Sequence, residues 1–210
     1  MFKNINKVIR TIVITDFFYN SAFALFGPVF AIFITSHIHN GTAGVAGLGV
    51  SVYWIVKSIF QLPIARFLDK TDGERDDYWA MTAGYFLTGF VPLAYIYVSE
   101  PWHLYLVNAI FGLIMAWVVP AWYSIFTRHV DKWRISFEWS LESVFAVGLA
   151  TAGASALGGW IVDHYGFNYL FIGAAVLTFL CSLLLLTMRK HLFGREEDGR
   201  IIPERPHQQK

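Results

Sequence analysis

Residues 61–80 read QLPIARFLDKTDGERDDYWA, and from Arg66 to Asp77 this stretch contains eight charged side chains in twelve positions. That density is unusual here, because only 15% of the 210 residues are charged whereas 56% are hydrophobic. Long apolar stretches lie on both sides of it, so charge is sorted by position along the chain. Such sorting is typical of a protein whose helices cross a bilayer and whose connectors lie in water.

Working outward from this connector, apolar runs of about twenty residues recur, and each is long enough to cross ~30 Å of hydrocarbon as a helix. Period-two alternation is absent, and helices are then the only structure that satisfies the backbone in lipid. The sequence predicts an all-α, multi-pass protein of the cell (inner or plasma) membrane. Its six predicted spans are 9–35, 43–67, 78–98, 103–127, 137–162 and 168–188.

Lysine and arginine predict the orientation of these spans. Fifteen of the sixteen basic residues lie before or at the start of span 1, from the end of span 2 to span 3, between spans 4 and 5, or after span 6. Because basic residues remain cytoplasmic, both termini and the 61–80 connector are predicted to be cytoplasmic. The exception is Lys57, inside span 2. The polar tail, residues 191–210, is rich in Gly, Pro and charge, and we expect most of it to be disordered.

The chain also resembles itself with a period just above ninety residues. LFGPVFAIF around Pro28 is similar to WVVPAWYSIF around Pro120, and the same offset aligns Asp16 with Asn108. Three spans per repeat is an odd number, so the two copies would face opposite ways in the membrane. Inverted repeats of this kind build many secondary transporters. The predicted repeats are residues 1–98 and 99–190.

The quoted connector resembles the signature that joins helices 2 and 3 in the major facilitator superfamily, G-x-x-x-D-[RK]-x-G-[RK]-[RK]. Ala65 stands at the first Gly position, and Asp69 and Lys70 match. One residue is inserted before Gly73, and Arg75 matches a basic position. The resemblance extends over nearly the whole chain, including the join HYGFNYLF before span 6.

The resemblance implies transport of a small solute by alternating access between two six-helix bundles. This chain supplies one bundle, so we expect a parallel homodimer, with a separately encoded half as the other possible partner. For Asp69, Lys70, Gly73 and Arg75 it implies a cytoplasmic gate motif, in which Asp69 bonds free N–H groups of a helix in the other half. Asn108 stands where the family usually has Arg, which argues against a typical proton-driven drug antiporter.

Ionisable residues inside the spans mark a candidate cavity, because each costs about 2.5–3.5 kcal/mol on insertion scales. They are Asp16, Lys57, Glu138 and Glu142. With a rise of ~1.5 Å per residue, Lys57 and Glu142 both lie ~12–13 Å from the cytoplasmic ends of their spans and could form an ion pair. Breaking that pair would let Glu142 take up a proton; alternatively, the pair only stabilises the bundle. Glu138 lies nearer the headgroups.

Other residues complete the predicted site. Asn20 lies one turn from Asp16, and the cavity set also contains Asn108, Trp54, Trp117 and Tyr123, of which the aromatic residues could equally pack against helices or lipid. Small residues at 41–49 and 146–159 are predicted to form the seam between copies. In the connector, the remaining acidic residues are expected to be solvated: Asp72, Glu74, Asp76 and Asp77.

Neither a Ser-His-Asp set, a phosphate loop nor a cysteine cluster is present, so we expect no enzyme, cofactor, metal or nucleic-acid partner. Two other classes stay open. One is a channel-like pore, and the other is a non-transporting membrane subunit that works with a separately encoded partner. The identity of the small-molecule substrate is left open by the sequence.

Overall fold

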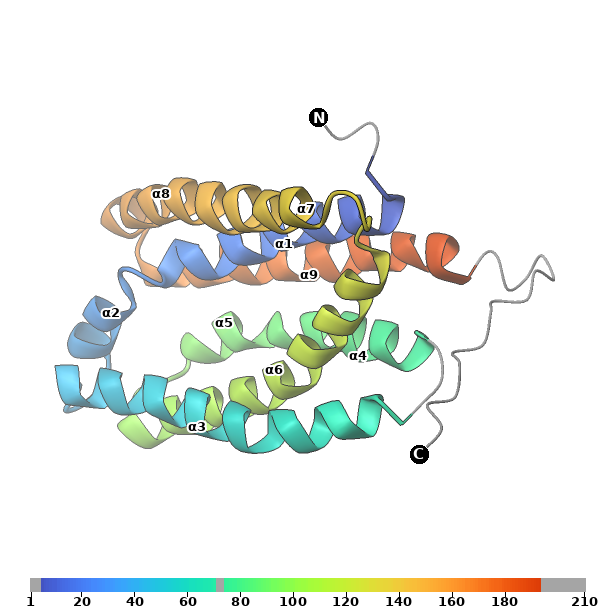
Figure 1. Cartoon of the computed structure of the whole chain (residues 1–210). Coiled ribbons are helices and arrows are strands. Elements are labelled where there is room, and N and C mark those ends of the chain that lie inside the picture. The colour runs from blue at the N-terminus through green and yellow to red at the C-terminus, as the bar shows by residue number, and fades with distance from the viewer. Residues whose placement is uncertain (1–4, 71–73, 194–210) are drawn as a thin grey trace.

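The computed structural model of the protein describes residues 5–70 and 74–193, and every regular element in these ranges is helical (Figure 1). The predicted all-α class is confirmed, and the six predicted spans correspond to six helical segments. The elements are α1 (Lys7–Phe26), α2 (Phe30–His37), α3 (Ala43–Leu68), α4 (Arg75–Thr88), α5 (Phe90–Tyr95), α6 (Pro101–His129), α7 (Ile135–Leu141), the π-helix η2 (Glu142–Leu149), α8 (Ala150–Tyr165) and α9 (Phe167–Phe193).

Five of the segments in the described part of the chain are long and apolar enough to cross a membrane, whereas the third is divided. The division falls at Gly89, between α4 and α5. A Cβ at Gly89 would lie 2.6 Å from the Phe179 ring, so the third segment packs closely on α9 there. In the first segment Pro28 cannot donate a helical hydrogen bond, and α1 ends at Phe26 before α2 begins at Phe30.

The last helix is longer than predicted. It continues past residue 188 to Phe193, so the predicted polar tail begins as helix. Leu192 is buried, and the Phe193 ring lies edge-on to Tyr78 with centroids 5.5 Å apart. The extra turn therefore packs against the core through these apolar side chains. The rest of the tail, from residue 194, lies outside the described residues.

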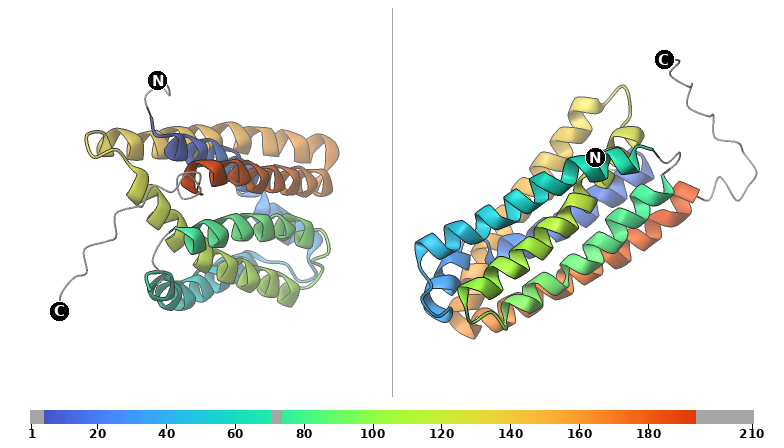
Figure 2. Two further views of the ribbon diagram at one scale, coloured as in Figure 1. Left: turned by 90° about the vertical axis from the view of Figure 1, so that its right-hand side faces the viewer. Right: turned by 90° about the horizontal axis from the view of Figure 1, so that it is seen from below.

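The helices form two layers, which Figure 1 shows from the side and Figure 2 shows end-on. One layer contains α1, α7, η2, α8 and α9; the other contains α3, α4, α5 and α6, and α2 leads from the first to the second. Within the layers α1 packs on α8 and α9, and α6 packs on α3 and α4, while α4 and α5 also contact α9. Span 1 therefore lies with spans 5 and 6, and span 4 lies with spans 2 and 3.

Small residues explain how closely these helices approach. Ala146, Ala150, Ala154 and Gly158 recur every fourth position and are buried, and a Cβ on Gly158 would collide with the carbonyl oxygen of Leu25. This stripe packs on α1 inside the bundle, so these four residues are not available for a seam between copies, while the seam along the rest of 41–49 and 146–159 stays a prediction. Packing of this kind needs side chains small enough for the backbones to meet.

Other small residues in the same predicted faces do remain uncovered. A Cβ on Gly47 of α3, or on Gly153 or Gly159 of η2–α8, would meet no atom within 4 Å. Each of the two helices therefore has an inner face of small residues that is occupied and an outer face that is open. In α3 the inner face includes Gly49, where a Cβ would lie 3.0 Å from the Asn108 amide nitrogen.

Candidate substrate cavity and buried carboxylates

Asp16 lies in the middle of α1 and is only 3% exposed. Its Oδ1 accepts a 2.6 Å hydrogen bond from the hydroxyl of Tyr85 on α4, and its Oδ2 accepts a 2.6 Å bond from Nε1 of Trp122 on α6. Tyr19, on the same helix as Asp16, stacks on Tyr85 with ring centroids 4.2 Å apart. Both carboxylate oxygens thus have donors, and both donors come from the opposite layer.

Glu142 is a second buried carboxyl group near Asp16. It is 7% exposed and begins η2, an eight-residue π-helix. Its Oε2 has no hydrogen-bond partner among the described residues, and its side chain interacts electrostatically with Asp16. π-Helical segments are rare and often lie at functional sites. The two carboxyl groups that the sequence placed separately in the cavity therefore belong to one buried centre, which we call the Asp16–Glu142 centre.

Glu138 is a third buried carboxyl group. It is fully buried within the protein, and its Oε2 accepts a 3.0 Å hydrogen bond from the backbone N–H of Asp131, while its Oε1 has no hydrogen-bond partner among the described residues. The carboxylate thus caps the connector between α6 and α7, and its predicted place near the headgroups and in the cavity stays a prediction.

The predicted ion pair between Lys57 and Glu142 is not formed in this structure. Lys57 belongs to α3, which packs on α6, whereas Glu142 begins η2, which packs on α1. The Lys57 Nζ lies instead 4.5 Å from the ring centroid of Trp54 and 5.9 Å from that of Tyr53. Equal depth along two helices does not make them neighbours, and this is why the predicted ion pair is wrong.

Two asparagines of the predicted cavity lie at different levels of burial. Asn108 of α6 is buried, and its Oδ1 accepts a 2.6 Å hydrogen bond from the hydroxyl of Tyr95 on α5. Asn20 is half-buried and donates its amide to the backbone oxygen of Asp16 at 2.9 Å. Asn108 therefore joins helices inside the bundle, whereas Asn20 lies at the edge of the Asp16–Glu142 centre.

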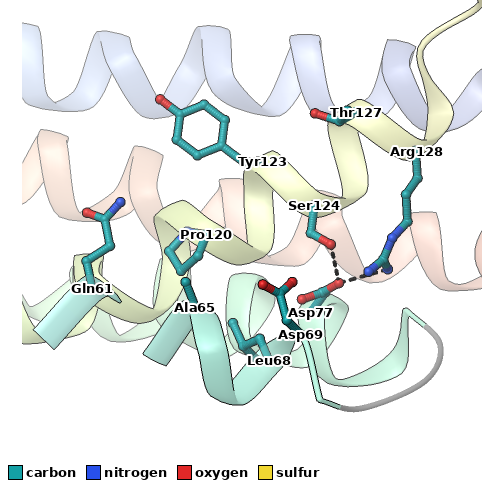
Figure 3. A pocket seen from close by; sticks show the side chains of 10 residues that line it. All are labelled: Gln61, Ala65, Leu68, Asp69, Asp77, Pro120, Tyr123, Ser124, Thr127 and Arg128. Atoms are coloured by element: carbon teal, nitrogen blue, oxygen red, sulfur yellow. Dashed lines mark hydrogen bonds and ion pairs between the residues drawn. The ribbon is translucent and has the colours of Figure 1, made fainter. Parts of the chain in front are cut away.

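The three aromatic residues predicted to line the cavity are all accessible in a single copy. Trp54 is 52% exposed, Tyr123 is 51% exposed and Trp117 is 38% exposed, with its ring edge-on to Phe67. Tyr123 and Gln61 border an open pocket between the ends of α3 and α6 (Figure 3). The aromatic residues therefore belong to open surfaces and not to an enclosed cavity.

The same pocket contains an ion pair that the sequence analysis missed. Asp77 is 1% exposed, and its Oδ2 lies 2.9 Å from Nη1 of Arg128 and accepts a 2.6 Å hydrogen bond from Ser124 (Figure 3). The prediction that Asp77 is a solvated connector residue is wrong, because the first turn of α4 packs on the last turn of α6. Burial raises the pKa of the Asp77 carboxyl, while the hydrogen bond from Ser124 and the charge of Arg128 oppose that rise. Nearby, Glu74 Oε2 lies 3.6 Å from His129 Nε2.

The gate motif lies beside this ion pair. Asp69 follows α3 as its C-cap residue and lines the same pocket as Asp77 and Arg128 (Figure 3). Lys70 is exposed, and Arg75 is exposed at the start of α4. Gly73, together with residue 72, lies outside the described residues. The role of Asp69 as a latch to another helix stays a prediction.

Sequence reasoning missed Tyr85, Trp122 and Arg128 as partners of buried acids. No pattern in the sequence around Tyr85 indicates its hydrogen bond to Asp16, because that bond depends on α4 facing α1. Trp122 follows Pro120 by two residues, and nothing in that spacing indicates that its indole reaches a buried acid. Arg128 was assigned to the set of cytoplasmic basic residues, and nothing in its spacing from Asp77 pointed to a contact.

These observations define a class of protein: a polytopic helical membrane protein with acidic side chains buried between its spans. The family model of the Major Facilitator Superfamily matches residues 12–206, nearly the whole chain. The protein therefore belongs to the Major Facilitator Superfamily, a family of membrane transporters, and the resemblance of its connector is confirmed. Comparison with curated proteins and with solved structures gives no match.

Proposed function

We propose that this protein transports a small solute across the cell membrane by alternating access, as a parallel dimer of two copies of the six-helix bundle. Membership of a transporter family supports the activity. The main observation in favour of a dimer is the position of Lys57 on α3, which is the least buried of the five long apolar segments. A side chain of this kind needs protein or water opposite it, which a second bundle would supply.

Magnitudes support this reading of Lys57. A lysine at the centre of a spanning helix costs about 2.5–3.5 kcal/mol on insertion scales. Its approach to the Trp54 ring returns only about 0.5–1 kcal/mol at an exposed site. The difference favours an aqueous cavity or a protein partner over lipid at this face. The exposed apolar residues elsewhere on α3 are compatible with lipid, so they do not by themselves indicate a second bundle.

Inverted repeats and cytoplasmic termini are part of the proposal. Packing is consistent with a two-fold relation between spans 1–3 and spans 4–6: α1 packs on the second and third segments of the other repeat, α8 and α9, and α6 packs likewise on α3 and α4. In Figure 1 the start of α1, the ends of α3 and α9, the start of α4 and the connector 130–134 all lie at one end of the bundle. The described basic connector residues gather at that end, as the positive-inside rule requires of a cytoplasmic face.

The Asp16–Glu142 centre favours a proton as the coupling ion. The two side chains that donate to Asp16, Tyr85 and Trp122, are neutral, and neither ion pair among the described residues includes Asp16 or Glu142. Two ionised carboxylates in one apolar interior would be costly, so a state in which one of the two is protonated is favoured. Gain and loss of that proton between the two access states would couple the proton gradient to transport.

Cysteine cross-linking in native membranes tests the dimer. In a Cys181→Ala background, Ser51→Cys on α3 and Leu157→Cys on α8 place thiols at exposed positions, each eight residues from the same end of the bundle. These helices lie in different layers, so a disulfide between them requires two copies (Figure 2). We expect a cross-linked dimer from this pair and none from the control pair Ser51→Cys with Val176→Cys on α9.

The result separates the candidate functions. Cross-linking together with substrate uptake by reconstituted liposomes supports the proposal. A protein that remains a single copy in the membrane and shows saturable uptake contradicts the dimer. Absence of uptake in any condition would favour the alternative of a membrane subunit that works with a separately encoded partner.

A further inference from the structure

Lys57 lies on a platform of aromatic side chains. Its Nζ is 4.5 Å from the Trp54 ring centroid and 5.9 Å from that of Tyr53, so the ammonium group lies beside both rings. The Tyr53 ring in turn packs on Phe111 of α6, with centroids 4.8 Å apart. The indole of Trp54 is 52% exposed. The platform is therefore anchored at Tyr53 and open at Trp54.

The backbone beneath this platform is held in place by α6. A Cβ on Gly112 would lie 2.6 Å from the carbonyl oxygen of Tyr53 and 3.3 Å from the backbone nitrogen of Lys57. Only a glycine allows α3 to approach α6 this closely. The side chain of Lys57 thus projects from a fixed helix, which is what a recognition site requires.

Two of the described acidic residues near the spans are engaged elsewhere, and Glu142 begins η2, which packs on α1 rather than on α3. Asp16 accepts hydrogen bonds from Tyr85 and Trp122, and Asp77 is paired with Arg128. Neither of the ion pairs among the described residues includes Lys57. An ammonium group has three donors and aromatic faces offer no lone pairs, so Lys57 retains hydrogen-bonding capacity for an anion.

We propose that Lys57, Tyr53 and Trp54 form the recognition site for an organic anion, a carboxylate-bearing solute with an apolar or aromatic part. The ammonium binds the carboxylate, and the exposed indole packs on the apolar part. The inference rests on the proposed transport function, since it names the substrate class. In a two-fold dimer each wall contributes one Lys57, whereas Asp16 and Glu142 are buried behind the walls, so the cavity selects anions.

Three probes that share a benzene ring test the charge preference. Benzoate, benzamide and benzylammonium are added separately to the full-length protein in nanodiscs, and thermal unfolding is followed, because a bound ligand raises the melting temperature. We expect benzoate to stabilise the protein in a saturable manner. Lys57→Gln weakens benzoate binding about tenfold, equivalent to about 1.4 kcal/mol, while Lys57→Arg retains binding. Lys132→Gln, in the exposed connector, is the matched control and leaves binding unchanged.

Each outcome decides the inference. It is overturned if benzoate gives no stabilisation, if benzamide or benzylammonium binds equally well, or if Lys57→Gln binds benzoate as tightly as the native protein. Uptake into liposomes is scored separately. If benzoate binding depends on Lys57 but no solute is taken up, the anion site is supported and the transport function is contradicted. If neutral or cationic solutes are taken up and this uptake does not depend on Lys57, the transport function is supported and the anion site is contradicted.

Discussion

Asp16 and Lys57 are both ionisable residues in the middle of long apolar helices, yet their surroundings differ. Asp16 is 3% exposed and receives hydrogen bonds from Tyr85 and Trp122, which belong to two other helices. Lys57 lies beside two rings of its own helix and forms no ion pair within the described chain. A single bundle therefore supplies hydrogen-bond partners for the Asp16 carboxylate, whereas among its described residues it supplies no ion-pair partner for the Lys57 ammonium group. Disturbing the first should alter stability, and disturbing the second should alter binding.

The largest effect is expected from Asp16→Ala. It leaves the Tyr85 hydroxyl and the Trp122 indole N–H without their acceptor in the interior, and each unsatisfied group costs about 1–3 kcal/mol, so we expect a loss of roughly 2–6 kcal/mol. Reversible unfolding in detergent measures it. Asp163→Ala, at an exposed position near the end of α8, is the control and should be neutral. Equal stability of the two variants would contradict the view that Asp16 is a structural centre.

Gly112→Ala should separate α3 from α6 and thereby disturb both regions. The added Cβ meets the Tyr53 carbonyl oxygen at 2.6 Å, and overpacking of this kind costs about 1–3 kcal/mol. Because the backbone of Lys57 lies at the same contact, benzoate binding should weaken as well. Gly47→Ala, where a Cβ meets nothing within 4 Å, is the control and should be neutral or slightly stabilising in both measurements.

Lys57→Gln should leave stability unchanged or raise it slightly while it weakens anion binding about tenfold. The reason is that removal of the cation leaves no described partner unsatisfied and eases its placement in the membrane. Thermal unfolding without ligand provides the first value and benzoate titration the second. A melting temperature that falls as far as that of Asp16→Ala would show that Lys57 belongs to the core, and the contrast between the two regions would disappear.

The smallest effects are expected from two tyrosine variants, each of which removes one hydroxyl. Tyr85→Phe and Tyr95→Phe should each cost about 0.5–1.5 kcal/mol, because each loses one buried hydrogen bond. Only Tyr85→Phe touches the carboxyl centre, so only it should change the pH dependence of uptake in liposomes. An equal change in both variants, or in neither, would argue against a role of the Asp16–Glu142 centre in coupling.

Local features of the sequence predicted the helical class because they depend on neighbours along the chain. Apolar length is a property of a few turns, and it predicted six spans that correspond to the six helical segments. The third segment was predicted as one span, but Gly89 divides it where Phe179 of α9 packs against it. That division depends on a contact between residues about ninety positions apart, which no local pattern reports.

The sequence predicted which residues belong to the candidate site, but it did not predict which residues they contact. Asp16 and Glu142 were recognised because charge in an apolar run is conspicuous, whereas their proximity depends on α1 packing on η2. Lys57 was assigned to Glu142 because the two share a depth, although they lie on helices that pack on different neighbours. Asp77 was assigned to solvent for the same reason: its partner Arg128 is contributed by another helix.

The sequence by itself determined that this is a helical membrane protein, which connectors are charged, and which family signature the 61–80 stretch carries, because hydropathy and motif spacing are properties of consecutive residues. Only the tertiary structure decided which acids are satisfied, that the small residues of α8 pack on α1, and that the lysine of α3 is half-buried beside two rings and belongs to neither ion pair of the described residues. Those outcomes depend on which helices are neighbours and how they are rotated. Both are set by packing between segments distant in the chain, and the free energy of that packing is absent from any single stretch.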